Sequence, residues 1–492
     1  MDSSAATEHL DVLVVGAGLS GVGAACQLRR RRPGATFAVL EARGTTGGTW
    51  DLFRYPGVRS DSDMYTLGYS FRPWTGGRAI ADGASIHEYI SDTAREFGVE
   101  ERIRYHHRVV SARFSSATGR WTVLVERPGP DGGTETATLT CGFLLSCTGY
   151  YRYDRGYAPQ FPGTADFTAA GGRLVHPQHW PTDLDVSGKR VVVVGSGATA
   201  VTLVPNLARD AAHVTMLQRS PSWVLALSSR DHLADRLRGR VPGRLAYSLV
   251  RAKHVAVATA SYQFSRRRPQ AARRFLRERV AARLPQGFDV DRHFTPRYDP
   301  WDQRVCFVPD GDLFRAVRAG TASVVTDGIE TFTAAGIRLA SGAELPADVV
   351  VTATGLDLLF LGGMRLEVDG QPVDPADRVV YRGMMISGVP NFAFALGYTN
   401  ASWTLKIDLV TEHVCRLLAL MERRGHRVVT PGEPRDPRRR PLIDLQSGYV
   451  RRAAGKLPQQ GVAAPWRLRQ NYPADVWTLR HRRVDDRALR FS

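Results

Sequence analysis

The fold is decided by the stretch Val12-Leu13-Val14-Val15-Gly16-Ala17-Gly18-Leu19-Ser20-Gly21, in which a short apolar strand runs directly into a glycine-rich turn. A second copy of the pattern reads Val191-Val192-Val193-Val194-Gly195-Ser196-Gly197-Ala198-Thr199-Ala200. Glycine lets the backbone turn tightly and approach a pyrophosphate, which then lies at the N-terminus of the following helix. One such turn is weak evidence, but two copies in a strand–turn–helix context predict two dinucleotide sites.

The strand after each turn indicates which dinucleotide is bound. Phe37-Ala38-Val39-Leu40 ends in Glu41, whose carboxylate can accept hydrogen bonds from a ribose 2′-hydroxyl and would repel a 2′-phosphate. Val214-Thr215-Met216-Leu217 ends instead in Gln218-Arg219-Ser220, where the arginine offers a fork of donors suited to a phosphate. We therefore expect FAD at the first turn and NADPH at the second. The alternative is that Glu41 and Arg219 are solvated charges at strand ends.

The composition is that of a large globular protein. The chain has 492 residues, 43% of them hydrophobic and 23% charged, which allows two or three domains. No run approaches the roughly 18 apolar residues of a membrane-spanning helix, and the stretch 1–10 lacks the basic start of a signal peptide. The five cysteines form no C-x-x-C pattern, which argues against a metal site and against a redox dithiol beside a flavin. We expect a cytoplasmic protein.

The net charge of +18 is concentrated in one region. Between Arg230 and Arg292 there are sixteen Lys or Arg against five acids, interleaved with apolar residues that include Val255, Phe264, Phe275 and Leu276. Such a surface could attract phosphate cofactors, or anionic lipid at the inner face of the membrane through a peripheral contact. Nucleic acid is not expected as a partner, because no nucleic-acid-binding motif accompanies the charge. The alternative is a solvated arginine-rich face.

Changes of pattern along the chain predict a discontinuous arrangement. Residues 1–150 form the first part of an FAD-binding domain, and residues 151–345 a linker and an NADP-binding domain with a basic helical insertion at about 223–294. Residues 346–492 form the second part of the FAD-binding domain and a C-terminal segment that wraps the surface. The strand at 348–355 is expected to return to the flavin sheet. The predicted fold class is α/β, with two Rossmann-like domains, the NADP domain being inserted in the FAD domain.

Longer motifs resemble the class B flavoprotein monooxygenases. Gly47-Gly48-Thr49-Trp50 is followed by Arg54-Tyr55-Pro56-Gly57, and Gly172-x-x-x-His176-x-x-x-Trp180-Pro181 precedes the second turn. The Trp-Pro ending is typical of the Baeyer–Villiger branch of that class, although Ala170 stands where its fingerprint has Phe. Motifs at 50–65, 176–181, 300–304 and 397–406 extend the resemblance over nearly the whole chain, and they are similar to those of the ethionamide-activating FAD-containing monooxygenases.

The resemblance implies a definite chemistry. FAD is reduced by NADPH and then reacts with O2 to give a flavin C4a-peroxide, which inserts one oxygen atom into a ketone to form an ester or lactone. Oxidation of thioether or thioamide sulfur is compatible with the same peroxide. By motif position the catalytic residues are Arg304, whose fixed cation stabilises the developing oxyanion, and Asp61, which orients it. The alternative is that the two form a structural ion pair.

The same resemblance extends to the cofactor contacts. Thr49, Trp50, Asp51 and Leu52 are expected to contact the flavin, a backbone group of Val109 to receive the adenine, and His176 to couple domain motion to the position of NADP unless it is only a packed hinge residue. The candidate cofactor-binding residues are Gly16, Gly18, Ser20, Gly21, Glu41, Thr49, Trp50, Asp51, Leu52, Arg59, Ser60, Asp61, Val109, Gly195, Ser196, Gly197, Ala198, Thr199, Ala200, Val201, Arg219 and Ser220.

Two other functions stay open. An N- or S-oxidising flavin monooxygenase without ketone activity would share the nucleotide turns, although Trp180-Pro181 and Arg304 argue against it. A membrane-associated binding protein with merely structural cofactors is the second, and two intact nucleotide turns argue against that. The physiological substrate and the oligomeric state do not follow from the residues.

Overall fold

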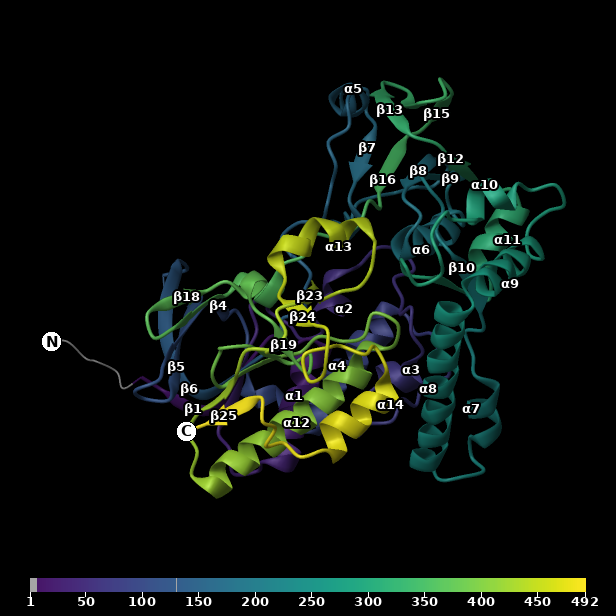
Figure 1. Ribbon diagram of the computed structural model, residues 1–492. Helices are drawn as coiled ribbons and strands as arrows, with labels where there is room; N and C mark the ends of the chain where they lie inside the picture. The colour runs from purple at the N-terminus through teal and green to yellow at the C-terminus, as the bar shows by residue number, and fades with distance from the viewer. Residues whose placement is uncertain (1–6, 130) are drawn as a thin grey trace.

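The computed structural model of the protein describes residues 7–129 and 131–492, so most of the stretch 1–10 and residue 130 lie outside the described part. Two sheets organise the chain, one at the lower left and one at the upper right of Figure 1. Within the described residues, no helix combines the length and the apolarity needed to cross a membrane.

The first unit is built on a nine-stranded sheet. Its strands are β1 (His9–Val15), β2 (Phe37–Leu40), β3 (Ile103–Arg104), β4 (Arg108–Ser115), β5 (Arg120–Pro128), β6 (Thr134–Ser146), β17 (Arg365–Val368), β18 (Gln371–Val373) and β21 (Phe392–Phe394). They follow the order β18-β17-β4-β5-β6-β1-β2-β3, with β21 also beside β6, and β6, β1, β2 and β3 run parallel. The long strand β6 joins this parallel half to an antiparallel half through β5.

Alternation along β1 divides the core of this unit between the two faces of the sheet. Val12 and Val14 pack into the cluster that contains α1 (Leu19–Arg31), α4 (Gly83–Glu96) and α12 (Trp403–Arg424). Leu13 and Val15 point the other way, into a cluster closed by chain segments after residue 357. A strand buried on both faces explains why its sequence is continuously apolar.

The second unit is a five-stranded parallel sheet. Its strands are β7 (Arg173–Val175), β8 (Arg190–Val194), β9 (His213–Gln218), β12 (Ala322–Thr326) and β16 (Val349–Thr352), in the order β12-β9-β8-β16-β7. Helices α6 (Ala198–Leu207) and α11 (Asp312–Arg318) pack on it, and α5 (Thr164–Ala169) adjoins a small sheet of β13 (Ile329–Thr333), β14 (Gly336–Leu339) and β15 (Glu344–Pro346). All of these strands lie between β6 and β17 in sequence, which confirms the α/β class and the inserted second Rossmann-like unit.

One expected connection is wrong. The strand near 348–355, realised as β16, does not return to the flavin sheet, because it pairs in parallel with β8 and β7 in the second sheet. The chain rejoins the first sheet only at β17, which pairs with β4. A Thr-Gly pair soon after a strand, as found after both β6 and β16, does not indicate which sheet the strand joins. The division at residues 150 and 345 otherwise stays a prediction.

The expected helical insertion is present in the second unit. It comprises β10 (Val224–Leu227), α7 (His232–Leu237), α8 (Gly243–Arg267), α9 (Pro269–Ala281) and α10 (Val290–Phe294). It ends at β11 (Cys306–Pro309), which pairs in parallel with β10. In Figure 1, α7 and α8 extend down beside the first unit, away from the sheet to which they belong in sequence.

The C-terminal segment consists of short elements that run over the first unit. They are β22 (Val429–Pro431), β23 (Arg439–Pro441), α13 (Gly448–Ala453), β24 (Gln459–Gly461), α14 (Tyr472–Asp475) and β25 (Leu489–Phe491). Strand β25 pairs back with β22, and the α12 carboxylate of Glu412 binds Arg31 and Arg480. The segment therefore covers the first unit and is tied to α12.

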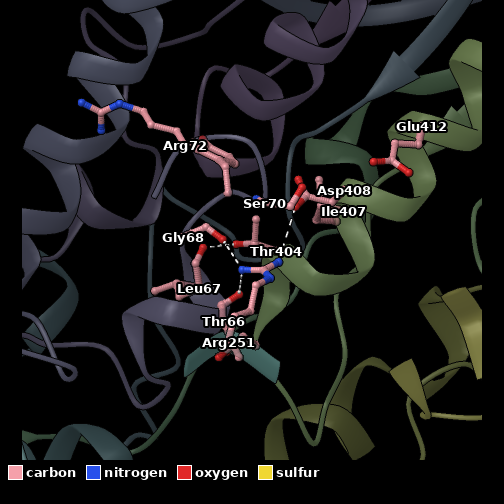
Figure 2. Close-up of polar contacts among 12 residues, drawn as sticks. Thr66, Leu67, Gly68, Ser70, Arg72, Arg251, Thr404, Ile407, Asp408 and Glu412 are labelled. Carbon is pink, nitrogen blue, oxygen red and sulfur yellow. Dashed lines mark hydrogen bonds and ion pairs between the residues drawn. The ribbon is translucent and has the colours of Figure 1, made fainter. Parts of the chain in front are cut away.

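A buried arginine fastens the insertion to the first unit. Figure 2 shows Arg251 of α8 between the turn after α3 (Met64–Leu67) and helix α12. Its Nη1 donates to the carbonyl oxygens of Tyr65 and Gly68 at 2.7 and 2.8 Å, and its Nη2 lies 3.5 Å from the carboxylate of Asp408. The backbone N–H of Ser70 donates to the same carboxylate. Hydrogen bonds to backbone carbonyl oxygens and an ion pair thus together hold helix α8 against the first unit.

We expect Arg251→Met to lower the free energy of unfolding by about 3–5 kcal/mol, because it strands the buried Asp408 carboxylate. Burial already raises the pKa of that carboxyl group. The measurement is urea unfolding, with Arg244→Met, an exposed position on the same helix, as the control. The double variant Arg251→Met/Asp408→Asn should recover part of the loss. A loss no larger than that of Arg244→Met would contradict the anchoring role.

Candidate active site

Both glycine-rich segments contribute to the wall of one cavity of about 640 Å³, although Gly195, Ser196 and Gly197 lie outside that wall. Its volume is in the range typical of ligand sites. The first turn contributes Gly16, Gly18 and Ser20 to the lining, and the start of α6 contributes Ala198 and Thr199. Two glycine-rich segments that lie far apart in the sequence therefore face a common space.

The first turn has the form that a pyrophosphate requires. Gly16 has φ of +100°, and a Cβ there would lie 2.8 Å from the carbonyl oxygen of Cys147. Gly18 is the N-cap of α1, and no side chain caps the helix, so its first N–H groups are available to an anion. Gly21 lies against the carbonyl oxygen of Gly16, where a Cβ would come within 1.7 Å. The glycines bring helix and strand close together, and the helix start faces the cavity.

The carboxylate of Glu41 lies beside this turn, at the carboxyl end of β2. It is 6% exposed and accepts hydrogen bonds from the backbone N–H groups of Ala17 at 2.7 Å and Arg43 at 2.9 Å. Burial raises its pKa, while these two bonds favour the ionised form. Its position in the cavity wall fits an acceptor for a ribose hydroxyl.

The other residues predicted for FAD divide into two groups. Thr49, Trp50, Arg59, Ser60, Asp61 and Val109 line the cavity. Asp51 and Leu52 do not. The buried Asp51 carboxylate instead forms ion pairs with Arg43 and Arg54. Arg43 is itself in the cavity wall, so Asp51 acts on the cavity through Arg43.

The second turn is open towards solvent. Gly195 has φ of +141°, and a Cβ there would lie 2.4 Å from the carbonyl oxygen of Ala353, whereas a Cβ on Gly197 would meet nothing within 4 Å. Gly197 is the N-cap of α6, again without a side-chain cap. Ala200 and Val201 are buried in the core of the unit.

The residues after β9 adjoin this turn. The Ser196 hydroxyl donates to the carbonyl oxygen of Ser220 at 3.0 Å, while the side chain of Arg219 is exposed. Gln218 is buried and donates to the Thr326 hydroxyl, which fixes the end of the strand. Arg219 and Ser220 lie outside the wall of the main cavity, beside the open helix start. An anion bound at α6 would be within the neighbourhood of Arg219 rather than inside the cavity.

Arg304 and Asp61 come from different units and meet in the cavity wall. Their Nη2 and Oδ2 atoms are 2.9 Å apart, and the side chains are 29% and 34% exposed. Burial lowers the pKa of the Arg304 guanidinium, but the charge of Asp61 and the nearby tyrosines Tyr449, Tyr150 and Tyr151 together more than offset this and raise that pKa above its ordinary value. The site therefore holds a permanent cation that a bound molecule can reach. The predicted pairing of these two residues is present.

His176 and Trp180 follow strand β7 of the second sheet. The Nδ1 atom of His176 accepts a hydrogen bond from the backbone of Gln178, and its buried Nε2 has no partner among the described residues. Burial lowers the pKa of this histidine, which favours the neutral ring. Trp180 is half-buried against the core of the second unit. Neither side chain is in the wall of the cavity.

Several cavity residues could not be found from motifs. Aromatic rings line much of the space beside Arg304, and Tyr150 stacks on Trp403 with ring centroids 5.3 Å apart. The indole N–H of Trp403 donates to the Ser20 hydroxyl at 2.8 Å, which joins α12 to the first turn. The aromatic residues in the wall are Trp50, Phe53, Tyr55, Tyr150, Tyr151, Tyr153, Phe307, Tyr398 and Trp403. Five of them belong to the motifs at 50–65 and 397–406, whereas no quoted motif contains Tyr150, Tyr151, Tyr153 or Phe307.

Two family models match the chain. Residues 14–77 match the NAD(P)-binding Rossmann-like domain, and residues 80–236 match the flavin-binding monooxygenase-like family. The first range contains the first glycine turn and Glu41. The second extends through the second turn and Arg219 to the start of the insertion.

Curated relatives match over almost the full length. The FAD-containing monooxygenase EthA of Mycobacterium tuberculosis is 53% identical over 488 residues, covering 99% of this chain and 98% of the relative. The probable FAD-binding monooxygenase AlmA of Acinetobacter baylyi is 46% identical over 488 residues, covering 99% and 96%.

Solved structures support the same fold. A steroid monooxygenase bound to NADP has a TM-score of 0.71 at 23% identity, with 86% of this chain and 87% of that chain covered. A closed cyclohexanone monooxygenase has a TM-score of 0.69 at 20% identity, with the same coverage. The glycine turns, the shared cavity and relatives of over 50% identity together establish that the chain belongs to the class B flavin monooxygenases, the family of FAD-containing, NADPH-dependent enzymes.

Proposed function

We propose that this monooxygenase is of the Baeyer–Villiger type and acts on ketones. One atom of O2 is inserted between the carbonyl carbon and a neighbouring carbon, which gives an ester or lactone. The second atom leaves as water, with two electrons and one proton supplied as the hydride of NADPH and one further proton from solvent. The cation of Arg304 in the wall of an aromatic-lined cavity is the observation that carries this proposal.

The residues around the cavity fit both cofactors. The uncapped start of α1 and the buried Glu41 would hold FAD, with Thr49, Trp50, Arg59, Ser60 and Val109 along its length. The uncapped start of α6, with Arg219 and Ser220 beside it, would hold NADPH. When bound, FAD takes a hydride from NADPH and activates O2. The protein's part is to bind both dinucleotides, to orient the substrate and to stabilise charge.

Arg304 would perform the electrostatic part of the reaction. As the ketone carbon becomes tetrahedral, negative charge develops on its oxygen, and a preorganised guanidinium within reach lowers the energy of that state. Asp61 orients the guanidinium through the 2.9 Å ion pair. The aromatic walls would exclude water and bind an apolar carbon skeleton.

The same site would also oxidise the sulfur of a thioether or thioamide, because such a substrate needs no tetrahedral oxyanion and fits the same apolar walls. An enzyme restricted to nitrogen and sulfur oxidation is the second candidate. The position of Arg304 beside the aromatic residues favours ketone activity over that restriction.

Arg304→Ala should keep bound FAD but lose oxygenated product by about 10²–10³-fold, because it removes one preorganised charge from the reacting oxygen. NADPH oxidation should continue in part and release hydrogen peroxide. Arg304→Lys keeps a charge without the planar fork and should recover only part of the product. The measurement is product formed per NADPH oxidised, with a ketone and a thioether. Wild-type coupling in Arg304→Ala would refute the assigned role.

Arg219→Ala should weaken the use of NADPH far more than that of NADH, because only NADPH carries the 2′-phosphate. A charge-assisted hydrogen bond contributes about 1.5–3 kcal/mol, which predicts a rise of one to two decades in KM for NADPH. Steady-state kinetics with both nucleotides test this. Arg209→Ala, an exposed arginine near the other end of α6, is the control. An unchanged ratio of the KM values for NADPH and NADH would contradict the assignment of Arg219 to the 2′-phosphate.

A peripheral contact with anionic membrane is a separate part of the proposal. Helix α8 exposes Leu245, Leu249, Val257 and Phe264, with Val257 at 60% and Leu245 at 50%, and α9 exposes Phe275. Leu276, by contrast, is buried and Val255 is half-buried, so two of the apolar residues expected at such a surface belong to the packing instead. Exposed arginines also occur on both helices and between them, among them Arg244 at the start of α8, Arg268 between α8 and α9, and Arg274 on α9. Exposed apolar residues accompanied by cations suit an anionic lipid surface.

Wild-type protein should co-sediment with vesicles that contain phosphatidylglycerol and remain in solution with pure phosphatidylcholine. Val257→Ser/Phe264→Ser should reduce binding several-fold, because it removes two apolar side chains from the face. Leu174→Ser is the matched control, since Leu174 is 40% exposed on β7, which lies at the top of Figure 1, away from α8 and α9. Equal, negligible binding to both kinds of vesicle would contradict the membrane contact and would indicate that the basic surface of the insertion is only solvated.

A further inference from the structure

The loop that carries Arg304 has an unusual backbone. Trp301 has φ of +72°, a conformation that a bulky residue adopts only when its surroundings hold it there. Its ring packs edge-on against Tyr262 of α8, with ring centroids 5.7 Å apart. The loop is therefore strained at a residue that contacts the insertion, three positions before Arg304.

Asp302 ties this loop to three segments at once. Its carboxylate accepts from Arg266 of α8 at 2.7 Å and from the backbone N–H of Asp299 at 3.2 Å. Its carbonyl oxygen accepts from the backbone N–H of Gln446, in the C-terminal segment just before α13, at 2.7 Å. One residue thus joins its own turn, the end of α8 and the C-terminal segment.

Helix α8 reaches from this loop to the first unit. Arg251, which binds the first unit, and Arg266, which binds the loop, are fifteen residues apart on one continuous helix, or about 22 Å at 1.5 Å per residue. Tyr247 adds a hydrogen bond from its hydroxyl to the carbonyl oxygen of Tyr69 at 3.1 Å. The helix is rigid and is fixed at one end to the unit that contains Asp61.

We propose that Asp302 is a positioning residue for Arg304. Helix α8 contacts both the loop and the first unit, and so fixes the position of the loop relative to the first unit. The proposal rests on the proposed role of Arg304. These contacts of Asp302, here called the clamp, keep the guanidinium 2.9 Å from Asp61, although Arg304 lies between strands β9 and β12 of the second sheet in sequence. Movement of the second unit during the reaction would then leave the cation in place beside the flavin site.

The ion pair between Arg266 and Asp302 would not hold the loop by itself, since exposed ion pairs contribute little to stability. The Arg266 side chain is 43% exposed and that of Asp302 is 23% exposed. The clamp depends on the combination of that pair with two backbone hydrogen bonds and the Trp301–Tyr262 contact. Asp302 is the residue at which three of these contacts meet, so its replacement is the sharpest test.

The experiment measures hydrogen–deuterium exchange of the backbone at 299–306 in the FAD-loaded full-length protein, together with product formed per NADPH oxidised. Asp302→Ala should raise exchange in this segment about tenfold, because it removes a charge-assisted hydrogen bond and the acceptor within the turn. Arg266→Gln should raise it by up to about fivefold, and Arg266→Lys should restore it. Arg267→Gln, at the exposed neighbouring arginine, is the control and should behave as wild type.

Product per NADPH should fall in the same order as exchange rises, with FAD content unchanged. The proposal is overturned if Asp302→Ala leaves exchange at wild-type level, or if exchange rises while coupling stays at wild-type level. Arg266→Gln changes only a surface side chain, so it keeps the test decisive if Asp302→Ala does not fold. If wild-type protein forms no oxygenated product, the proposed function fails instead, and the exchange data alone decide whether Asp302 holds the loop.

Discussion

An ion pair across the two units, Arg304 to Asp61, is the contact around which the site is organised. Asp61 follows the first glycine turn in sequence, and Arg304 lies beyond the insertion in the second unit. Their meeting requires the two Rossmann-like sheets to adopt one relative position, in which the first turn and the start of α6 line a single cavity. A cation held by a carboxylate in a partly buried wall keeps its charge and its direction, and this is the property that stabilisation of a developing oxyanion needs.

The insertion packs against the first unit, although it belongs to the second unit in sequence. It interrupts the second unit, yet α8 is fastened to the first unit by Arg251, which reaches the backbone carbonyls of Tyr65 in α3 and Gly68 just after it, and the carboxylate of Asp408 (Figure 2). The basic surface that the insertion carries is therefore attached to the flavin side of the molecule. The exposed apolar residues of α8 face away from this anchor, because Leu245 and Leu249 lie about 120° and 160° around the helix from Arg251.

Much of the fold follows from local sequence. The two glycine turns, the acid Glu41 and the arginine Arg219 each occupy the position relative to a strand that the pattern predicts, because these features depend only on neighbours in the chain. The sheet that β16 joins could not be predicted in this way, since a short apolar strand fits either sheet and pairing is decided by tertiary contacts. The placing of Tyr150 and Phe307 in the cavity wall and the Arg251–Asp408 contact depend on distant segments coming together, so no spacing in the sequence reveals them.

The most direct test of the account follows the oxygen itself. Purified wild-type protein loaded with FAD is incubated with NADPH, ¹⁸O2 and a ketone, and the organic product is analysed by mass spectrometry. The account predicts an ester or lactone that contains one ¹⁸O atom, with one NADPH consumed for each product molecule. Oxidation of NADPH with all of the reduced oxygen recovered as hydrogen peroxide, and no label in any ketone product, would contradict it.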